Sequence, residues 1–154
     1  MAYAVESVLR REEESSRVLN RDVFLYLLDL EVKRSRRYQN FFCILILRLT
    51  ETADGEVEKG LRASYERLAH LLQQEVRDSD ILGTLGEKRL AVLLPYADMS
   101  AGIYTRSRFE SSLQYCDFHR EGYQVIVENI CFPNDGTDTS DLVRKVIGPD
   151  AANL

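Results

Sequence analysis

Apolar residues follow two patterns along the chain. Apolar side chains at every third or fourth position predict helices, and short continuous apolar runs predict strands. Residues 41–49 are apolar except for Arg48, which is typical of a central strand covered on both faces. Residues 61–76 carry apolar side chains every three or four positions, as on one face of a helix. The spacings predict, in order, helices at 3–16 and 20–37, a strand at 41–49, a helix at 56–76, strands at 80–85 and 90–94 around a turn at 86–89, a helix at 98–114, a strand at 123–132 and a helix at 140–147.

The order of these elements indicates an α+β fold. A hairpin at 80–94 interrupts an otherwise regular alternation of helices and strands, which predicts a mixed sheet that contains antiparallel pairs and is flanked by helices. Asn20 can cap the helix that follows it, and the basic run at 33–37 suits the C-terminal end of that helix. We expect a helical lead-in at residues 1–17 and one domain at 18–154.

Composition narrows the class of protein. The chain has 154 residues, of which 45% are hydrophobic and 29% charged, as in ordinary globular domains. Its net charge of −5 argues against a general nucleic-acid surface, and no apolar run is long enough for a membrane span. No signal peptide is evident, and Cys43, Cys116 and Cys131 are an odd, scattered set typical of reduced thiols, so a cytoplasmic protein is expected.

Several local strings share one order and spacing with a known family. Leu19 to Phe24 reads LNRDVF, Arg36-Arg37-Tyr38 precedes the first strand, and Arg77-Asp78-Ser79-Asp80 stands five residues before Gly86-Glu87-Lys88-Arg89-Leu90. A Pro-ended apolar strand and the late turn at 132–136 follow. This order resembles the GGDEF domain, the catalytic domain of diguanylate cyclases, over about residues 18–147. The resemblance implies a nucleotide-cyclase-like fold.

The sequence departs from that family at the positions that carry the catalytic chemistry of its cyclases. Cyclases of this family join two GTP molecules with carboxylate-held divalent metals that neutralise phosphate charge. The position of the metal-binding Asp of the first strand falls on Arg48, and GGDEF becomes GEKRL, with Lys88 and Arg89 in place of the acidic pair. Glu87 replaces a glycine, and the guanine-contacting Asp of the next helix falls on Arg62. We therefore expect cyclase activity to be lost, with no cofactor or metal required.

The RxxD string is the strongest candidate for a site. Alone it is weak evidence, since chance supplies about one such spacing in a chain of this composition. Arg77 can donate a bidentate fork to guanine O6 and N7, and Asp80 can accept from the N1–H and N2 groups. In the family, RxxD at this distance from the signature turn forms an inhibitory site for cyclic di-GMP. The resemblance extends that site to Arg108, and to Arg34 supplied by a neighbouring domain.

Other interpretations of the same residues stay open. Arg77 and Asp80 could be a helix-end ion pair, which contributes little at a surface. Lys88 and Arg89 could be a solvated hairpin tip or could bind phosphate without metal. Cys116-Asp117-Phe118-His119 has C-x-x-H spacing without a second ligand pair, which favours a structural loop over zinc. His70 has no evident Cys or Ser partner for nucleophilic catalysis.

The sequence thus predicts a non-catalytic receptor that binds cyclic di-GMP through Arg77, Asp80, Arg108 and Arg34, with output through a second copy or a partner protein. One alternative is an interaction module that needs no nucleotide. The other is a domain that binds GTP at the altered hairpin without cyclising it.

Overall fold

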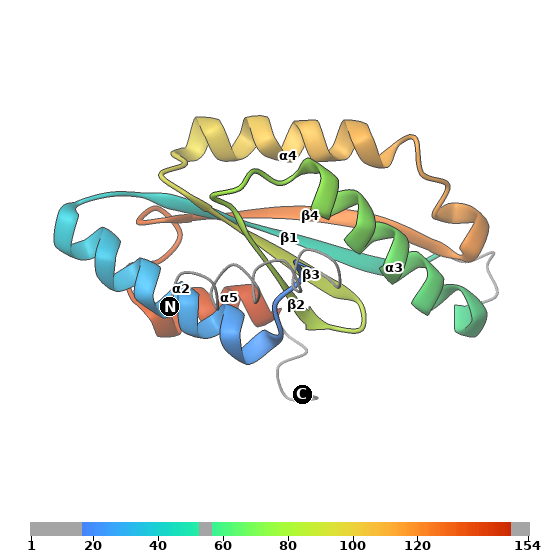
Figure 1. The fold of residues 1–154 in the computed structure, drawn as a ribbon, viewed down its shortest axis with the longest axis horizontal. Helices are drawn as coiled ribbons and strands as arrows, with labels where there is room; N and C mark the ends of the chain where they lie inside the picture. The colour runs from blue at the N-terminus through green and yellow to red at the C-terminus, as the bar shows by residue number, and fades with distance from the viewer. Residues whose placement is uncertain (1–16, 53–56, 149–154) are drawn as a thin grey trace, which may run out of the picture.

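A computed structural model describes residues 17–52 and 57–148, and its elements follow the predicted order (Figure 1). The helices are α2 (Arg21–Tyr38), α3 (Val57–Glu75), α4 (Met99–Leu113), the 3-10 helix η1 (His119–Glu121) and α5 (Thr139–Ile147). The strands are β1 (Phe42–Glu51), β2 (Ile81–Gly86), β3 (Arg89–Pro95) and β4 (Tyr123–Phe132). The predicted helix at 3–16 lies outside the described residues, and η1 is an element that the sequence pattern did not predict. None of the described helices is long and apolar enough to cross a bilayer.

The four strands form one sheet in the order β2-β3-β1-β4. β1 pairs with β3 on one side and with β4 on the other, and its side chains are buried on both faces of the sheet, which explains its nearly continuous apolar sequence. All three pairings are antiparallel, so the α+β class is confirmed. The predicted mixed character is limited, among the described residues, to a parallel bridge between Leu19 and Gly83. α3 connects β1 to β2 and α4 connects β3 to β4, so each of these helices joins two strands that run in the same direction and are not neighbours in the sheet.

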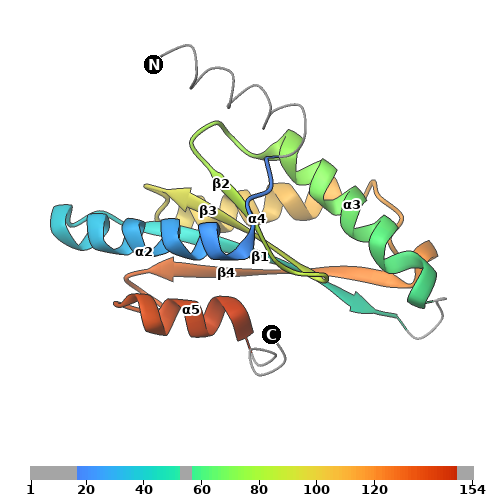
Figure 2. The ribbon, with the colours of Figure 1, turned by 60° about the horizontal axis from the view of Figure 1, so that its bottom comes forward.

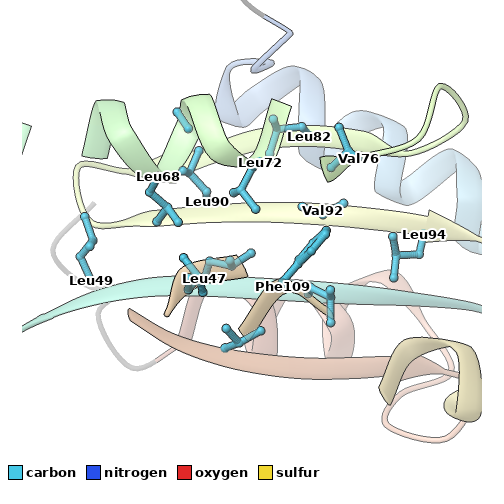
Figure 3. Packing of buried hydrophobic residues seen from close by; sticks show 14 of the residues in the cluster. Leu47, Leu49, Leu68, Leu72, Val76, Leu82, Leu90, Val92, Leu94 and Phe109 are labelled. Atoms are coloured by element: carbon cyan, nitrogen blue, oxygen red, sulfur yellow. The ribbon is translucent and has the colours of Figure 1, made fainter. Parts of the chain in front are cut away.

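Helices cover both faces of the sheet (Figures 1 and 2). On one face α3 and α4 pack on alternate residues of the strands, and Figure 3 shows Phe109 of α4 directed at Leu47 and Val92 of the central strands. On the other face α2 and α5 cover the intervening residues, with Phe24 and Leu142 fully buried. The period-two alternation of each strand therefore supplies two separate cores.

Local signals set the ends of several helices. The side chains of Asn20, Asp98 and Asp138 accept hydrogen bonds from backbone N–H groups in the first turns of α2, α4 and α5. At the β2–β3 hairpin, Gly86 has φ 144°, a conformation that favours glycine. The hairpin tip lies against β1, because the Leu49 N–H donates to the Lys88 carbonyl at 2.8 Å. The hairpin therefore reaches the end of the central strand.

We predict that Phe24→Ala lowers the free energy of unfolding by about 3–5 kcal/mol, because it leaves a cavity under α2. Phe24 is fully buried, whereas Phe41 is 41% exposed and is the matched control. Phe41→Ala should change stability by no more than about 0.5 kcal/mol. Urea unfolding followed by far-UV circular dichroism measures both. Equal losses in the two variants would contradict the assigned packing of α2.

Candidate functional site

A tight turn follows α3 and contains both residues of the RxxD string. The Asp80 N–H donates to the Arg77 carbonyl at 3.0 Å, and the Asp80 Oδ2 atom accepts from the Arg77 N–H at 2.9 Å. Buried Val76 anchors the turn, while the Arg77 side chain is exposed. The contact between the two residues is thus carboxylate to backbone, and not the side-chain ion pair that the sequence also allowed. This leaves the Arg77 guanidinium facing solvent beside a fixed carboxylate.

Arg108 of α4 reaches the same helix end. Its Nη2 atom donates to the Glu75 carbonyl at 3.1 Å, and its Nε atom lies 3.8 Å from the Glu75 carboxylate. Ser112 donates to the other oxygen of that carboxylate at 2.9 Å. The Arg108 Nε atom is buried without a hydrogen-bond partner. A cation is favoured here, because the last carbonyl groups of a helix carry partial negative charge. The structure therefore brings Arg108 to the end of α3, two residues before Arg77.

Arg34 lies elsewhere. It belongs to α2, on the face of the sheet opposite α3 and α4, and its guanidinium binds the carboxylate of Glu31 and the hydroxyl of Tyr96. It also lies over the Tyr96 ring, 4.6 Å from the ring centre. The Glu31 carboxylate raises the pKa of Arg34 above its ordinary value. Within one chain Arg34 therefore lies away from the RxxD turn. The expectation from the sequence is that a neighbouring domain, and not the same one, supplies this residue.

The basic residues of the altered hairpin contact protein groups. Arg48 and Arg89 stand opposite each other in the β1–β3 register, where like charges repel. Arg48 pairs with Glu128 at 3.2 Å, and Lys88 pairs with Glu51 at 3.2 Å. Arg89 is half-buried and donates to the Ile147 carbonyl at the end of α5. Arg89 thus links the last helix to the sheet, whereas Lys88 is an exposed residue of the hairpin tip.

A cleft of about 550 Å³ lies between α3 and the hairpin. Its lining comprises Leu61, Arg62, Tyr65, Thr84, Gly86 and Glu87. The Tyr65 hydroxyl donates to the Thr84 hydroxyl at 2.7 Å across the cleft. Arg62 is exposed and pairs with Glu66 at 3.2 Å, four residues further along α3. The cleft is mostly apolar apart from these groups and could accept a flat ring.

The described residues contain no group of three or more His, Cys, Asp or Glu side chains placed to hold a metal ion. Cys43 and Cys131 are directly opposite each other on β1 and β4, and both are buried. Burial raises the pKa of both thiols, and the Cys131 thiol raises that of Cys43 further. Cys116 is half-buried and His119 is exposed on η1. Cys43 and Cys131 therefore act as core residues, as the sequence predicts.

Two residues at the end of α3 and the RxxD turn, Glu75 and Arg17, were not identified from the sequence. Glu75 orients Arg108 and Ser112, and the Arg17 Nη2 atom donates to the Arg77 carbonyl at 3.4 Å. A helix-end carboxylate two residues before the RxxD string is the signal that could have indicated Glu75. No sequence signal links Arg17 to Arg77, because their contact spans 60 positions.

Comparison with known proteins identifies the fold. No family model and no curated protein matches the sequence. A DGC protein from Thermotoga maritima superposes with a TM-score of 0.72 at 15% identity, over 85% of this chain and 94% of that chain. The GGDEF domain of YfiN from Pseudomonas aeruginosa gives a TM-score of 0.68 at 16% identity, over 84% of this chain and 85% of that chain.

A third structure is the GGDEF domain of DgcB from Caulobacter crescentus in complex with c-di-GMP. Its TM-score is 0.61 at 13% identity, over 84% of this chain and 79% of that chain. The chain has the fold of a GGDEF domain. Fold likeness at such low identity does not carry activity, so function has to be argued from the residues of this GGDEF-like domain.

We predict that a disulfide-type thiol reagent modifies native protein first at Cys116. Cys43 and Cys131 should react only on unfolding, because burial restricts access and their raised pKa disfavours the reactive thiolate. Absorbance of the released thiol, with and without denaturant, measures this. In a Cys116→Ser variant the fast phase should vanish. Three equal rates in the native state would contradict the assignment.

Proposed function

We propose that this GGDEF-like domain is a non-catalytic receptor for cyclic di-GMP, which it binds at the turn that follows α3. The observation that carries the proposal is the meeting of Arg77, Asp80 and Arg108 at one helix end. These residues come from two elements that are far apart in sequence, and Arg108 contacts the Glu75 carbonyl two residues before Arg77. Output would then pass by contact with a second copy or a partner protein.

The geometry of the turn suits a guanine base. Asp80 uses its Oδ2 atom to bind the Arg77 N–H, which holds the carboxylate in place and leaves Oδ1 to accept from guanine N1–H or N2. The exposed Arg77 guanidinium can donate to O6 and N7, or to a phosphate. Adenine would place an acceptor nitrogen against the Asp80 carboxylate and would be rejected. The site should therefore prefer guanine dinucleotides over adenine dinucleotides.

Arg108 supplies the charge that a phosphate needs. Its guanidinium is held at the helix end by Glu75 and retains a buried Nε donor without a partner. A small rotation would direct its donors to a ligand phosphate, where charge-assisted hydrogen bonds are stronger than the carbonyl contact. In this proposal Arg34 completes the site from a second copy. That step requires Arg34 to leave Glu31 and Tyr96, so it depends on the ligand or the partner.

The non-catalytic part of the proposal is supported by the hairpin. Arg48 and Arg89 stand at positions where cyclase chemistry needs carboxylates for a divalent metal. Their contacts with Glu128 and the Ile147 carbonyl give them structural roles. A metal ion beside these two guanidinium groups would be repelled. Binding without turnover is the function that this arrangement favours.

A second candidate function is GTP binding without cyclisation. It is favoured by the cleft of about 550 Å³ between α3 and the hairpin, into which Arg62 and Tyr65 extend from α3. Against it, Arg62 and Lys88 already pair with Glu66 and Glu51, and Tyr65 bonds Thr84 across the cleft. If neither cyclic di-GMP nor GTP binds, the remaining interpretation is a protein interaction module that needs no nucleotide.

We predict that isothermal titration calorimetry detects micromolar binding of cyclic di-GMP, with at least tenfold weaker binding of cyclic di-AMP. Arg77→Ala with Asp80→Ala should abolish the heat of binding. Arg108→Ala should weaken binding by about tenfold or more, because a charge-assisted hydrogen bond contributes about 1.5–3 kcal/mol.

Two neighbours serve as matched controls in that titration. Asp78→Ala changes an exposed carboxylate of the same turn, and Arg106→Ala changes an exposed Arg of α4 that pairs with Glu110. Both should bind as the wild type does. Absence of wild-type binding, or unchanged binding after the double substitution at Arg77 and Asp80, would refute the receptor function.

We also predict that incubation with GTP and Mg²⁺ or Mn²⁺ yields no cyclic di-GMP by liquid chromatography. GTP should give no heat of binding at micromolar concentration. If GTP binds, Lys88→Ala and Arg62→Ala variants decide the site, since both side chains are exposed and neither holds the core. Loss of GTP binding in these variants, together with intact cyclic di-GMP binding, would establish the second candidate as an additional function.

A further inference from the structure

The residues before α2 lie along the edge of the sheet. The Leu19 N–H donates to the Leu82 carbonyl at 2.9 Å, and the Thr84 N–H donates to the Leu19 carbonyl at 2.9 Å. β2 is an outer strand, so this pairing occupies backbone groups that an edge strand would otherwise expose. We call residues 17–20 the edge segment. Figure 2 shows it running into α2 beside the hairpin strands.

Arg17 begins the edge segment and contacts the end of α3. Its N–H donates to the Gln73 Oε1 atom at 3.0 Å, and the Gln73 Nε2 atom in turn donates to the Ala69 carbonyl at 3.3 Å. Its Nη2 atom donates to the Arg77 carbonyl at 3.4 Å, which is long for a hydrogen bond. The backbone of Arg17 is thus fixed on α3, while its guanidinium is held weakly beside the RxxD turn.

Three arginines therefore lie at the C-terminal end of α3 and the turn that follows it. Arg108 contacts the Glu75 carbonyl, Arg17 contacts the Arg77 carbonyl, and Arg77 itself is exposed. They come from α4, from the edge segment and from the turn, so only the folded chain assembles them. Carbonyl oxygens at a helix end are partial charges and hold cations weakly, whereas a phosphate carries a full charge. The arrangement favours a ligand with more than one phosphate.

We infer that Arg17 is a further ligand-binding residue of the cyclic di-GMP site, an inference that rests on the proposed function. On binding, Arg17 exchanges its long bond to the Arg77 carbonyl for charge-assisted bonds to a ligand phosphate. The ligand then contacts the edge segment as well as the turn and α4. Because the edge segment leads directly into α2, the N-terminal end of α2 is coupled to occupancy of the site.

Thermodynamic reciprocity gives this contact a second consequence. Suppose that the ligand binds Arg17 only while the edge segment is paired with β2. Pairing then raises the affinity for the ligand, and bound ligand must raise the equilibrium constant for pairing by the same factor. Two backbone hydrogen bonds, those of Leu19 and Thr84, report the pairing directly. Exchange of these two amide protons should therefore slow when cyclic di-GMP is added.

The experiment compares Arg17→Ala and Arg17→Lys with Arg36→Ala, an exposed Arg of α2 that serves as the control. Calorimetry should show cyclic di-GMP binding about tenfold or more weaker in Arg17→Ala, partly restored in Arg17→Lys, and unchanged in Arg36→Ala. Binding measured at two salt concentrations should depend less on salt in Arg17→Ala, because one phosphate contact is lost. A residue that merely holds the turn would not change the salt dependence.

Hydrogen exchange by NMR completes the test. In the wild type, saturating cyclic di-GMP should slow exchange of the Leu19 and Thr84 amides at least fivefold, and Arg17→Ala should remove that protection. The inference is overturned if Arg17→Ala binds with wild-type affinity and salt dependence while the variant at Arg77 and Asp80 does not bind. That result would leave the proposed function intact. Absence of wild-type binding would overturn both.

Discussion

The pairing of β1 with a strand on each side is the constraint on which the rest of the structure depends. With both edges hydrogen-bonded and both faces covered, β1 fixes the register of β3 and β4 and thereby separates two cores. A shift of one residue would exchange the faces and move the β1 side chains of each core into the other, where they would not fit the packing. The hairpin, the end of α3 and the start of α4 are therefore held in fixed positions around a rigid centre.

The C-terminal end of α3 is where that rigidity becomes useful. The last carbonyl groups of the helix have no partner inside the helix, and Arg108 donates to that of Glu75. Arg17 contacts the Arg77 carbonyl of the following turn, which also accepts from the Asp80 N–H. The turn that follows holds Asp80 on the backbone of Arg77. A group of cations beside a fixed carboxylate therefore accompanies the end of the helix, and the proposed binding of cyclic di-GMP rests on it.

The hairpin shows how a sheet tolerates basic residues where cyclase chemistry needs carboxylates. Opposed Arg48 and Arg89 repel each other, and each has acquired an acceptor on another element, Glu128 on β4 and the Ile147 carbonyl at the end of α5. Gly148 leaves room for this contact, since a Cβ there would come within 2.7 Å of Arg89. Arg89 thus holds the last helix to the sheet, and Arg48 links β1 to β4.

The sequence by itself determined the kind and order of the described strands and α-helices, though not of η1, because apolar spacing, helix caps and the Gly86 turn act over a few residues. It also indicated the GGDEF fold and the RxxD turn, since both are expressed as strings of fixed spacing. Only the tertiary structure decided that β1 pairs antiparallel with both β3 and β4, that Asp80 binds backbone, and that Arg108 and Arg17 contact carbonyls at and just after the end of α3. The contacts of Arg108 with Glu75 and of Arg17 with Arg77 join residues that are 33 and 60 positions apart, and no local sequence pattern encodes contacts over such separations. They follow from the packing of α4 and the edge segment against α3 and β2, which depends on burial summed over the whole domain.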